Sequence, residues 1–400
     1  MKPNSPCPSF FSFLTTLTSS PFRQRMAQEL RHELVSVKTQ DGQSLDGLVL
    51  WDPGRKPRGT TLSMHPDSSR LTHFELEPLA RSGLMTMRLK SRYAGNNATM
   101  IMEEIMLDLA AGVAFLRERG CEKVALFGHS GGGPLMAFYQ SQAESPTVSS
   151  TPAGDPPDLT KADLPKADAI IITNSHLGRH LEFTNRIDPA VSDESDPLSV
   201  DPSLDMYNSA NYQTREGGVV YSQPFLERYR AAQKARCNRI TAWVRAKLHE
   251  IGEKKHPGVH DLPFIIYRTM ANPRFLDRTN FKSGMRTGTL WGEPYRLNYR
   301  AERGREGPFV TLKSWLSHLY YGSANAETLR HIARTQAPLL IVSGTADYGG
   351  DIAEAVYEAA ATSDKKLEYV QGATHWFESH PDHLNQAMTT ISEWLSARDF

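Results

Sequence analysis

Hydrophobic positions along this chain follow two different patterns. From about residue 33 onward, short apolar runs alternate with longer segments whose apolar positions recur at helical spacing. The short runs predict strands, and the longer segments predict helices. The predicted strands are 33–39, 45–51, 59–64, 83–90, 124–129, 167–173, 337–343 and 366–370, and the predicted helices are 71–82, 99–119, 134–144 and 382–397.

The alternation of strands and helices indicates an α/β protein with a mostly parallel central sheet that is flanked by helices on both faces. The alternation breaks between residues 174 and 336. This insertion contains a long helical pattern at 225–251, which we expect Gly252 to end. Its polar side is basic, which is typical of a solvated helix face, and a basic lip that attracts anionic substrates is the alternative.

Composition and charge exclude several classes of partner. The 400 residues carry 45 Lys and Arg against 45 Asp and Glu, so no net field favours nucleic acid or an anionic membrane. Cys7, Cys121 and Cys237 are too few and too far apart for a disulfide framework or a metal site, which favours a cytoplasmic location. No stretch is apolar enough to span a bilayer. Residues 1–30 predict a disordered extension, with a targeting segment as the alternative.

One motif indicates nucleophilic chemistry. The apolar run 124–127 leads into Gly128-x-Ser130-x-Gly132, and a helix-compatible segment, 134–139, follows. A serine on so tight a strand-to-helix turn has strained backbone geometry and an exposed hydroxyl. The flanking strand and helix favour this interpretation over an ordinary turn serine.

A serine nucleophile needs a base and a group that orients the base. Asp347 lies just beyond the strand predicted at 337–343, and His375 lies just beyond the last predicted strand. The carboxyl ends of parallel strands share one edge of a sheet, so we expect both side chains to meet Ser130 there. A turn aspartate and a surface histidine are the alternatives.

Together, the motif and the order Ser…Asp…His resemble the α/β-hydrolase fold superfamily. The resemblance implies that Ser130 is the nucleophile, His375 the general base and Asp347 the orienting carboxylate. It also implies that the insertion is a mainly helical cap. The expected division is a disordered extension at 1–30, a hydrolase core at 31–175 and 331–400, and the cap at 176–330.

The resemblance further implies an oxyanion hole. One donor would be the backbone N–H of Gly131, directly after the nucleophile. The other would come from the loop after the third strand, where Pro66 stands in place of the usual glycine and has no N–H. The expected second donor is therefore the backbone of Asp67.

Four further residues are candidates for contact with substrate. They are His65, Arg92, His129 and Trp376. Arg92 would either pair with a substrate carboxylate or anchor its own loop, and His129 would either line the pocket or pack under the turn.

The sequence therefore predicts a serine hydrolase that cleaves a carboxylic ester or lactone through an acyl-enzyme, without cofactor or metal. A thioesterase or a carbon–carbon bond hydrolase on the same triad is the alternative, and a non-catalytic binding protein is a third hypothesis. The expected partner is a small-molecule substrate with an apolar acyl or alcohol part. A homodimer is left open.

Overall fold

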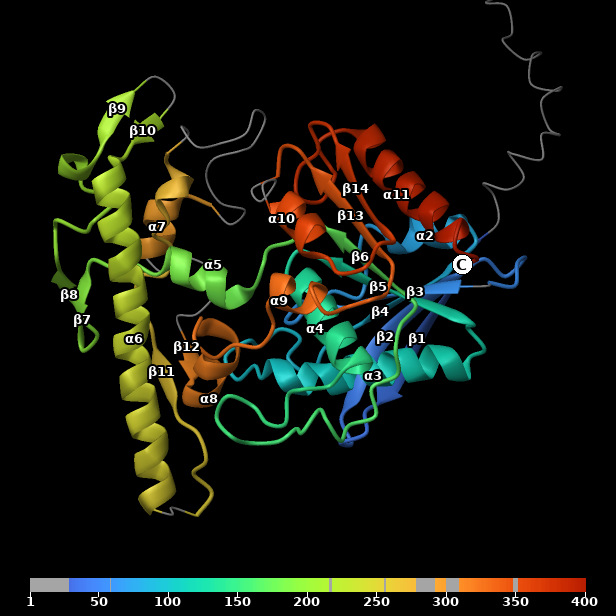
Figure 1. Ribbon diagram of the computed structural model, residues 1–400, viewed down its shortest axis with the longest axis horizontal. Coiled ribbons are helices and arrows are strands. Elements are labelled where there is room, and N and C mark those ends of the chain that lie inside the picture. Colours follow the sequence, from blue (N-terminus) through green and yellow to red (C-terminus); the bar gives the residue numbers. More distant parts are fainter. Residues whose placement is uncertain are drawn as a thin grey trace, which may run out of the picture.

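The computed structural model describes residues 29–57, 59–215, 218–254, 257–277, 292–299, 309–347 and 352–400. Figure 1 shows a sheet with helices on both sides and, beside it, a second lobe built around one long helix. The extension predicted at 1–30 falls almost wholly outside the described residues. In the described part of the chain, no helix is both long enough and apolar enough to cross a membrane.

The central sheet has eight strands in the order β1-β2-β4-β3-β5-β6-β13-β14. Only the β1–β2 and β2–β4 pairs are antiparallel, and the other five pairs are parallel. The strands are β1 (Arg31–Lys38), β2 (Ser44–Trp51), β3 (Gly59–Ser63), β4 (Met85–Leu89), β5 (Lys123–His129), β6 (Ala169–Thr173), β13 (Leu339–Gly344) and β14 (Lys365–Val370). This mostly parallel sheet confirms the predicted fold class.

Side chains of the inner strands alternate between two apolar layers. On β5, Val124 and Leu126 belong to one buried cluster, and Ala125 and Phe127 belong to another on the opposite face. Because helices cover both faces, successive residues are all apolar, which explains the uninterrupted hydrophobic run in the sequence.

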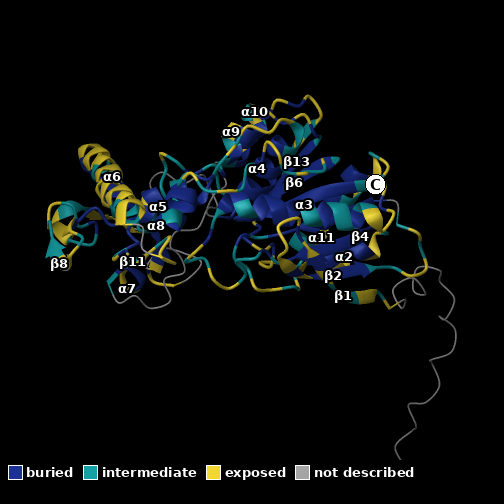
Figure 2. Cartoon of the chain, turned by 90° about the horizontal axis from the view of Figure 1, so that it is seen from below, coloured by how far each residue is buried: buried dark blue, intermediate teal, exposed yellow. Residues whose placement is uncertain are grey.

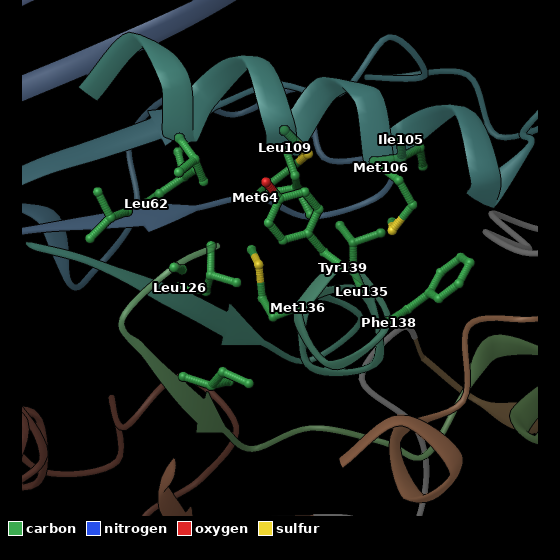
Figure 3. Packing of buried hydrophobic residues seen from close by; sticks show 14 of the residues in the cluster. Leu62, Met64, Ile105, Met106, Leu109, Leu126, Leu135, Met136, Phe138 and Tyr139 are labelled. Carbon is green, nitrogen blue, oxygen red and sulfur yellow. The ribbon is translucent and has the colours of Figure 1, made fainter. Parts of the chain in front are cut away.

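Helices α3 (Met102–Glu118) and α4 (Gly132–Glu144) pack in the first cluster, and α2 (Leu76–Arg81) and α11 (Pro381–Ser396) pack in the second. Figure 3 shows Met106 and Leu109 of α3 pointing toward α4, which carries Leu135 and Met136, with Leu126 of β5 next to Met136. The two short helices α9 (Thr328–Ile332) and α10 (Ile352–Ala359) add to the first cluster.

The second lobe is the insertion between β6 and β13. Its helices α5 (Arg179–Arg186), α6 (Gln223–Lys254), α7 (Pro294–Tyr299) and α8 (Leu312–Ser314) are joined by three described two-stranded sheets, β7–β8, β9–β10 and β11–β12. The strands of these sheets are β7 (Val191–Asp193), β8 (Asp196–Val200), β9 (Gln213–Arg215), β10 (Gly218–Val220), β11 (Pro263–Ile265) and β12 (Phe309–Thr311). We call this lobe the cap. Figure 2 shows exposed residues along α6, in contrast to the buried sheet.

Some basic side chains of α6 stabilise the cap from within. Arg236 is completely buried and forms an ion pair with Glu194 at 2.7 Å, and Arg230 donates to the carbonyl oxygen of Asn185 at 2.9 Å. These contacts hold the helix against β7, β8 and α5. They favour a structural role for these side chains over a basic lip for anionic substrates.

Two boundary predictions are wrong. The helix predicted at 71–82 is reduced to α2, because a helix beginning at residue 71 would place Pro78 in its interior, whereas a start at Leu76 places it in the first turn. The long helix does not end at Gly252 but continues to Lys254. A glycine costs only about 1 kcal/mol in a helix, and here it lies in the last turn.

A buried carboxyl joins the cap to the core. Glu103, at the start of α3, accepts hydrogen bonds from the hydroxyl of Ser317 at 2.7 Å and the side-chain amide of Asn325 at 2.8 Å. Ser317 lies in a π-helix, Trp315–Leu319, and also accepts the N–H of Met102. Burial raises the pKa of Glu103. These bonds fix the cap against the end of α3.

Candidate active site

Ser130 occupies the turn between β5 and α4. Its backbone has φ of 55°, in the left-handed region that residues other than glycine rarely adopt. The Ser130 N–H donates to the carbonyl oxygen of Thr173 at 3.1 Å, which fixes the turn to β6. A Cβ at Gly128 would lie 2.7 Å from the Gly132 carbonyl oxygen, and one at Gly132 would lie 2.7 Å from that of Met64. The motif glycines are therefore required by close backbone packing.

Asp347 and His375 meet at the same edge of the sheet. Asp347 follows β13 and is 3% exposed, and His375 follows β14 and is 8% exposed. His375 Nδ1 lies 3.0 Å from Asp347 Oδ1. Since a carboxylate only accepts, Nδ1 carries the proton and Nε2 has the free lone pair.

The His375 imidazole lies beside the turn that carries Ser130. Its ring centre is 4.7 Å from that of His129, the residue immediately before Ser130. Within the described residues, Ser130 Oγ makes no hydrogen bond to His375 at the usual distance. Such a contact often forms only in the substrate complex. Ser130 and His375 therefore lie near one another, but they do not form a hydrogen bond in this structure.

Gly131 is the N-cap residue of α4, and its N–H donates to no acceptor in the described chain. His65 Nε2 lies 2.9 Å and His176 Nε2 lies 3.5 Å from the position where a Gly131 side chain would begin. Two imidazoles thus border the space above this amide, so His65 lies next to the proposed nucleophile.

The Asp67 loop is arranged around its carboxylate. The Asp67 N–H faces His65 Nδ1 at a long 3.5 Å. The carboxylate contacts His65 Nδ1 at 2.9 Å, Arg179 of the cap at 2.8 Å and the Asn97 side-chain amide at 3.0 Å. Burial would raise the pKa of Asp67, but Arg179 and His65 hold it far below its usual range. The carboxylate therefore stays charged and ties the loop to the cap.

Arg92 forms ion pairs with three neighbouring carboxylates. It pairs with Asp41 at 2.6 Å, Asp108 at 2.7 Å and Glu104 at 3.4 Å. Burial lowers the pKa of this guanidinium, but the paired carboxylates outweigh it and raise the pKa overall. These contacts correspond to the loop-anchoring interpretation, and we leave Arg92 out of the proposed site.

His129 packs beneath the turn. It is 5% exposed, and its Nδ1 lies 3.0 Å from the Thr173 hydroxyl. Burial lowers the pKa of His129 well below its ordinary value, and nearby His375 and His73 add to this. A neutral His129 supports the turn and adds no positive charge beside His375.

Trp376 borders an open groove next to His375. Its indole is 42% exposed, and its ring centre lies 4.9 Å from that of His375 in an edge-on arrangement. The groove has a volume of about 550 Å³. It is lined by Arg70, Thr72, His73, Phe74, Trp376, Phe377, Glu378, His380, Pro381 and Leu384. Ser130 is not among these residues, so the groove does not enclose Ser130.

Sequence reasoning missed two residues near this edge, Arg179 and Asn174. Arg179 lies on α5 and had no motif to mark it. Asn174 directly follows β6 and has φ of 40°, so an asparagine after a buried strand was the only available signal. Among the described residues, no cluster of three or more His, Cys, Asp or Glu side chains is placed to hold a metal ion.

Comparison with known proteins finds similarity at the level of the fold. No protein-family model matches the chain, and no curated protein does. Three similar solved structures each cover 92% of this chain at 13% identity. They are DcsB in complex with its substrate analogue (TM-score 0.51, 99% of that chain), the α/β hydrolase GrgF from Penicillium sp. sh18 (TM-score 0.51, 99% of that chain) and a hypothetical protein from Pseudomonas aeruginosa (TM-score 0.50, 94% of that chain).

Proposed function

Since the chain has the α/β-hydrolase fold, we propose that it is a serine hydrolase that cleaves a carboxylic ester or lactone with Ser130, His375 and Asp347. The fold alone does not fix the activity, so the site must carry the proposal. The observation that supports it most is the buried Asp347–His375 hydrogen bond of 3.0 Å, at the edge where Ser130 lies in strained backbone geometry.

In the proposed mechanism, Ser130 Oγ attacks the substrate carbonyl carbon while His375 Nε2 accepts the hydroxyl proton. Asp347 keeps the other imidazole proton on Nδ1 and stabilises the imidazolium. The Gly131 N–H, with Asp67 as the proposed second donor, binds the oxyanion. His375 then protonates the departing alkoxide, which leaves an acyl-enzyme. A water molecule, deprotonated by His375, releases the acid and restores Ser130.

Labelling by a fluorophosphonate probe tests the nucleophile. We expect the probe to label the wild type and not Ser130→Ala, because the probe reacts only with an activated hydroxyl. Ser192→Ala, which removes an exposed serine of the cap, is the matched control and should be labelled normally. Labelling of Ser130→Ala at the wild-type rate would remove Ser130 from the mechanism. A wild type that never reacts would favour the non-catalytic alternative.

Turnover of three substrate classes tests the bond that is cleaved. Short aryl esters, acyl thioesters and vinylogous diketones should be compared with the wild type and Ser130→Ala. The proposal requires Ser130-dependent turnover to be fastest on the esters. Faster turnover of thioesters or diketones would reassign the chemistry while keeping the triad.

A further inference from the structure

We propose that Asn174 and Ser175 are positioning residues that hold the nucleophile, the acid and the base in one arrangement. The two residues follow β6 and touch the backbone beside all three proposed catalytic residues. This inference rests on the proposed function, because it assigns them a role in the reaction that Ser130 would perform.

Asn174 joins the segment that carries the base to the strand that carries the acid. Its side-chain amide donates to the carbonyl oxygens of His375 at 2.7 Å and Thr374 at 3.1 Å. Its side-chain oxygen accepts the N–H of Gly344 at 2.7 Å. Gly344 in turn accepts the N–H of Asp347 at 3.1 Å. One buried side chain therefore fixes both ends of the Asp347–His375 pair.

Ser175 holds the nucleophile turn. Its hydroxyl lies 2.7 Å from the Ser130 carbonyl oxygen and 3.1 Å from that of His176, and it has one proton to donate. The shorter distance favours Ser130. A Cβ at Gly133 would lie 2.0 Å from the Ser175 hydroxyl, so this contact exists only because residue 133 has no side chain.

The chemistry at position 174 requires an amide. The side chain must donate two hydrogen bonds and accept one, and only an amide does so at this length. Aspartate has the same shape but has no donor, so it would place an anion against the His375 and Thr374 carbonyl oxygens. Asparagine also tolerates the φ of 40° found here, as glycine does and alanine does not.

The test compares Asn174→Asp, Asn174→Gly and Ser175→Ala with the wild type. Asn174→Asp removes the donors at constant shape, and Asn174→Gly removes the whole side chain while permitting the backbone conformation. Asn272→Asp is the matched control, because that buried cap asparagine acts as an acceptor to Arg230 and Arg274, which aspartate also does. Thermal unfolding identifies the variants that fold.

In the folded variants, we expect both Asn174 changes to lower kcat and the fluorophosphonate labelling rate on the order of 10²-fold, with KM changed less than about threefold. The pH midpoint of kcat should also shift, because His375 is displaced relative to Asp347. Ser175→Ala should lower the same rates by about tenfold. A role in stability alone would lower the melting temperature and leave these parameters unchanged.

Two results overturn this inference in different ways. If the wild type is labelled, Ser130→Ala is not, and the folded Asn174 variants are labelled at the wild-type rate, then the hydrolase proposal stands and the positioning role is wrong. If the wild type itself is never labelled, the proposed function fails first, and the positioning role fails with it.

Discussion

At the scale of single residues, the Asp347 carboxylate determines which nitrogen of His375 bears the proton. We predict that Asp347→Asn lowers kcat on the order of 10⁴-fold near neutral pH. The new amide can donate to Nδ1, which would place the imidazole proton on Nε2 and block its role as a base. Steady-state kinetics with an ester substrate measure this loss.

The control for this change is Asp364→Asn, which alters a partly exposed aspartate paired with Arg398 at the far end of β14. It should retain wild-type turnover. If Asp347→Asn kept a tenth of the wild-type kcat, the carboxylate would have no orienting role.

Site residues differ in how readily they can be predicted from the sequence. Ser130, Asp347 and His375 were identifiable as candidates because each lies just beyond the end of a predicted strand, so the neighbouring sequence carries the signal. Asn174 acts on partners up to 201 positions away, and Arg179 pairs with Asp67 across the boundary between cap and core. A role that depends on contacts between residues distant in the chain is not marked by a pattern in the neighbouring sequence.

At the scale of elements, His331 connects α9 to α4. Its Nε2 lies 2.7 Å from the Asn325 carbonyl oxygen and must carry the proton, so Nδ1 accepts the Ser141 hydroxyl at 2.5 Å. Burial lowers the pKa of His331 to about 4, from an ordinary value of 6.5. The folded state therefore requires the neutral imidazole.

This shift predicts acid sensitivity. Between pH 6.5 and about 4, the unfolded chain binds a proton at His331 that the folded chain does not, so stability falls as the pH falls through this window. The contribution is about 3 kcal/mol over the whole window. Urea unfolding at several pH values should show a smaller pH dependence for His331→Gln than for the wild type. His249→Gln, at an exposed site on α6, should not change the dependence, and an unchanged dependence in His331→Gln would contradict the prediction.

The helices around the sheet could be predicted because their apolar period spans many residues, and the inner strands because each is an uninterrupted apolar run. The helix predicted at 71–82 was too long because we gave the apolar periodicity more weight than Pro78. The three two-stranded sheets described in the cap were not predicted. Strands of three residues, such as β9 and β11, are shorter than the window over which a period can be recognised.

At the scale of the whole molecule, the Arg179–Asp67 ion pair links the cap to the loop beside the proposed nucleophile. We predict that Arg179→Gln loosens this link. Removing one partner of a fully buried ion pair lowers the stability of a protein by about 3–5 kcal/mol. The loss of stability here should be smaller, because the Asp67 side chain is 20% exposed. In Arg179→Gln, the backbone amides of α5 should exchange hydrogen faster than in the wild type, while those of α3 keep their protection. The kcat of this variant should also fall.

Arg179→Lys keeps the charge and should restore part of the protection. Arg330→Gln, which removes an exposed arginine paired with Glu327, is the control and should change neither measurement. Unchanged exchange in α5 of Arg179→Gln would show that the ion pair does not hold the cap.

The chain leaves the sheet for the cap and returns to it at one place. The Thr328 N–H donates to the Leu177 carbonyl oxygen at 2.7 Å, so the segment 178–327 begins and ends side by side. In chain connectivity, that whole segment is a single insertion, and each doubling of the length of a loop costs only about 0.6 kcal/mol in closure entropy. Replacing segment 178–327 at this junction would change the residues around the proposed active site and keep Ser130, Asp347 and His375, so we expect substrate selectivity to be exchangeable with that one segment.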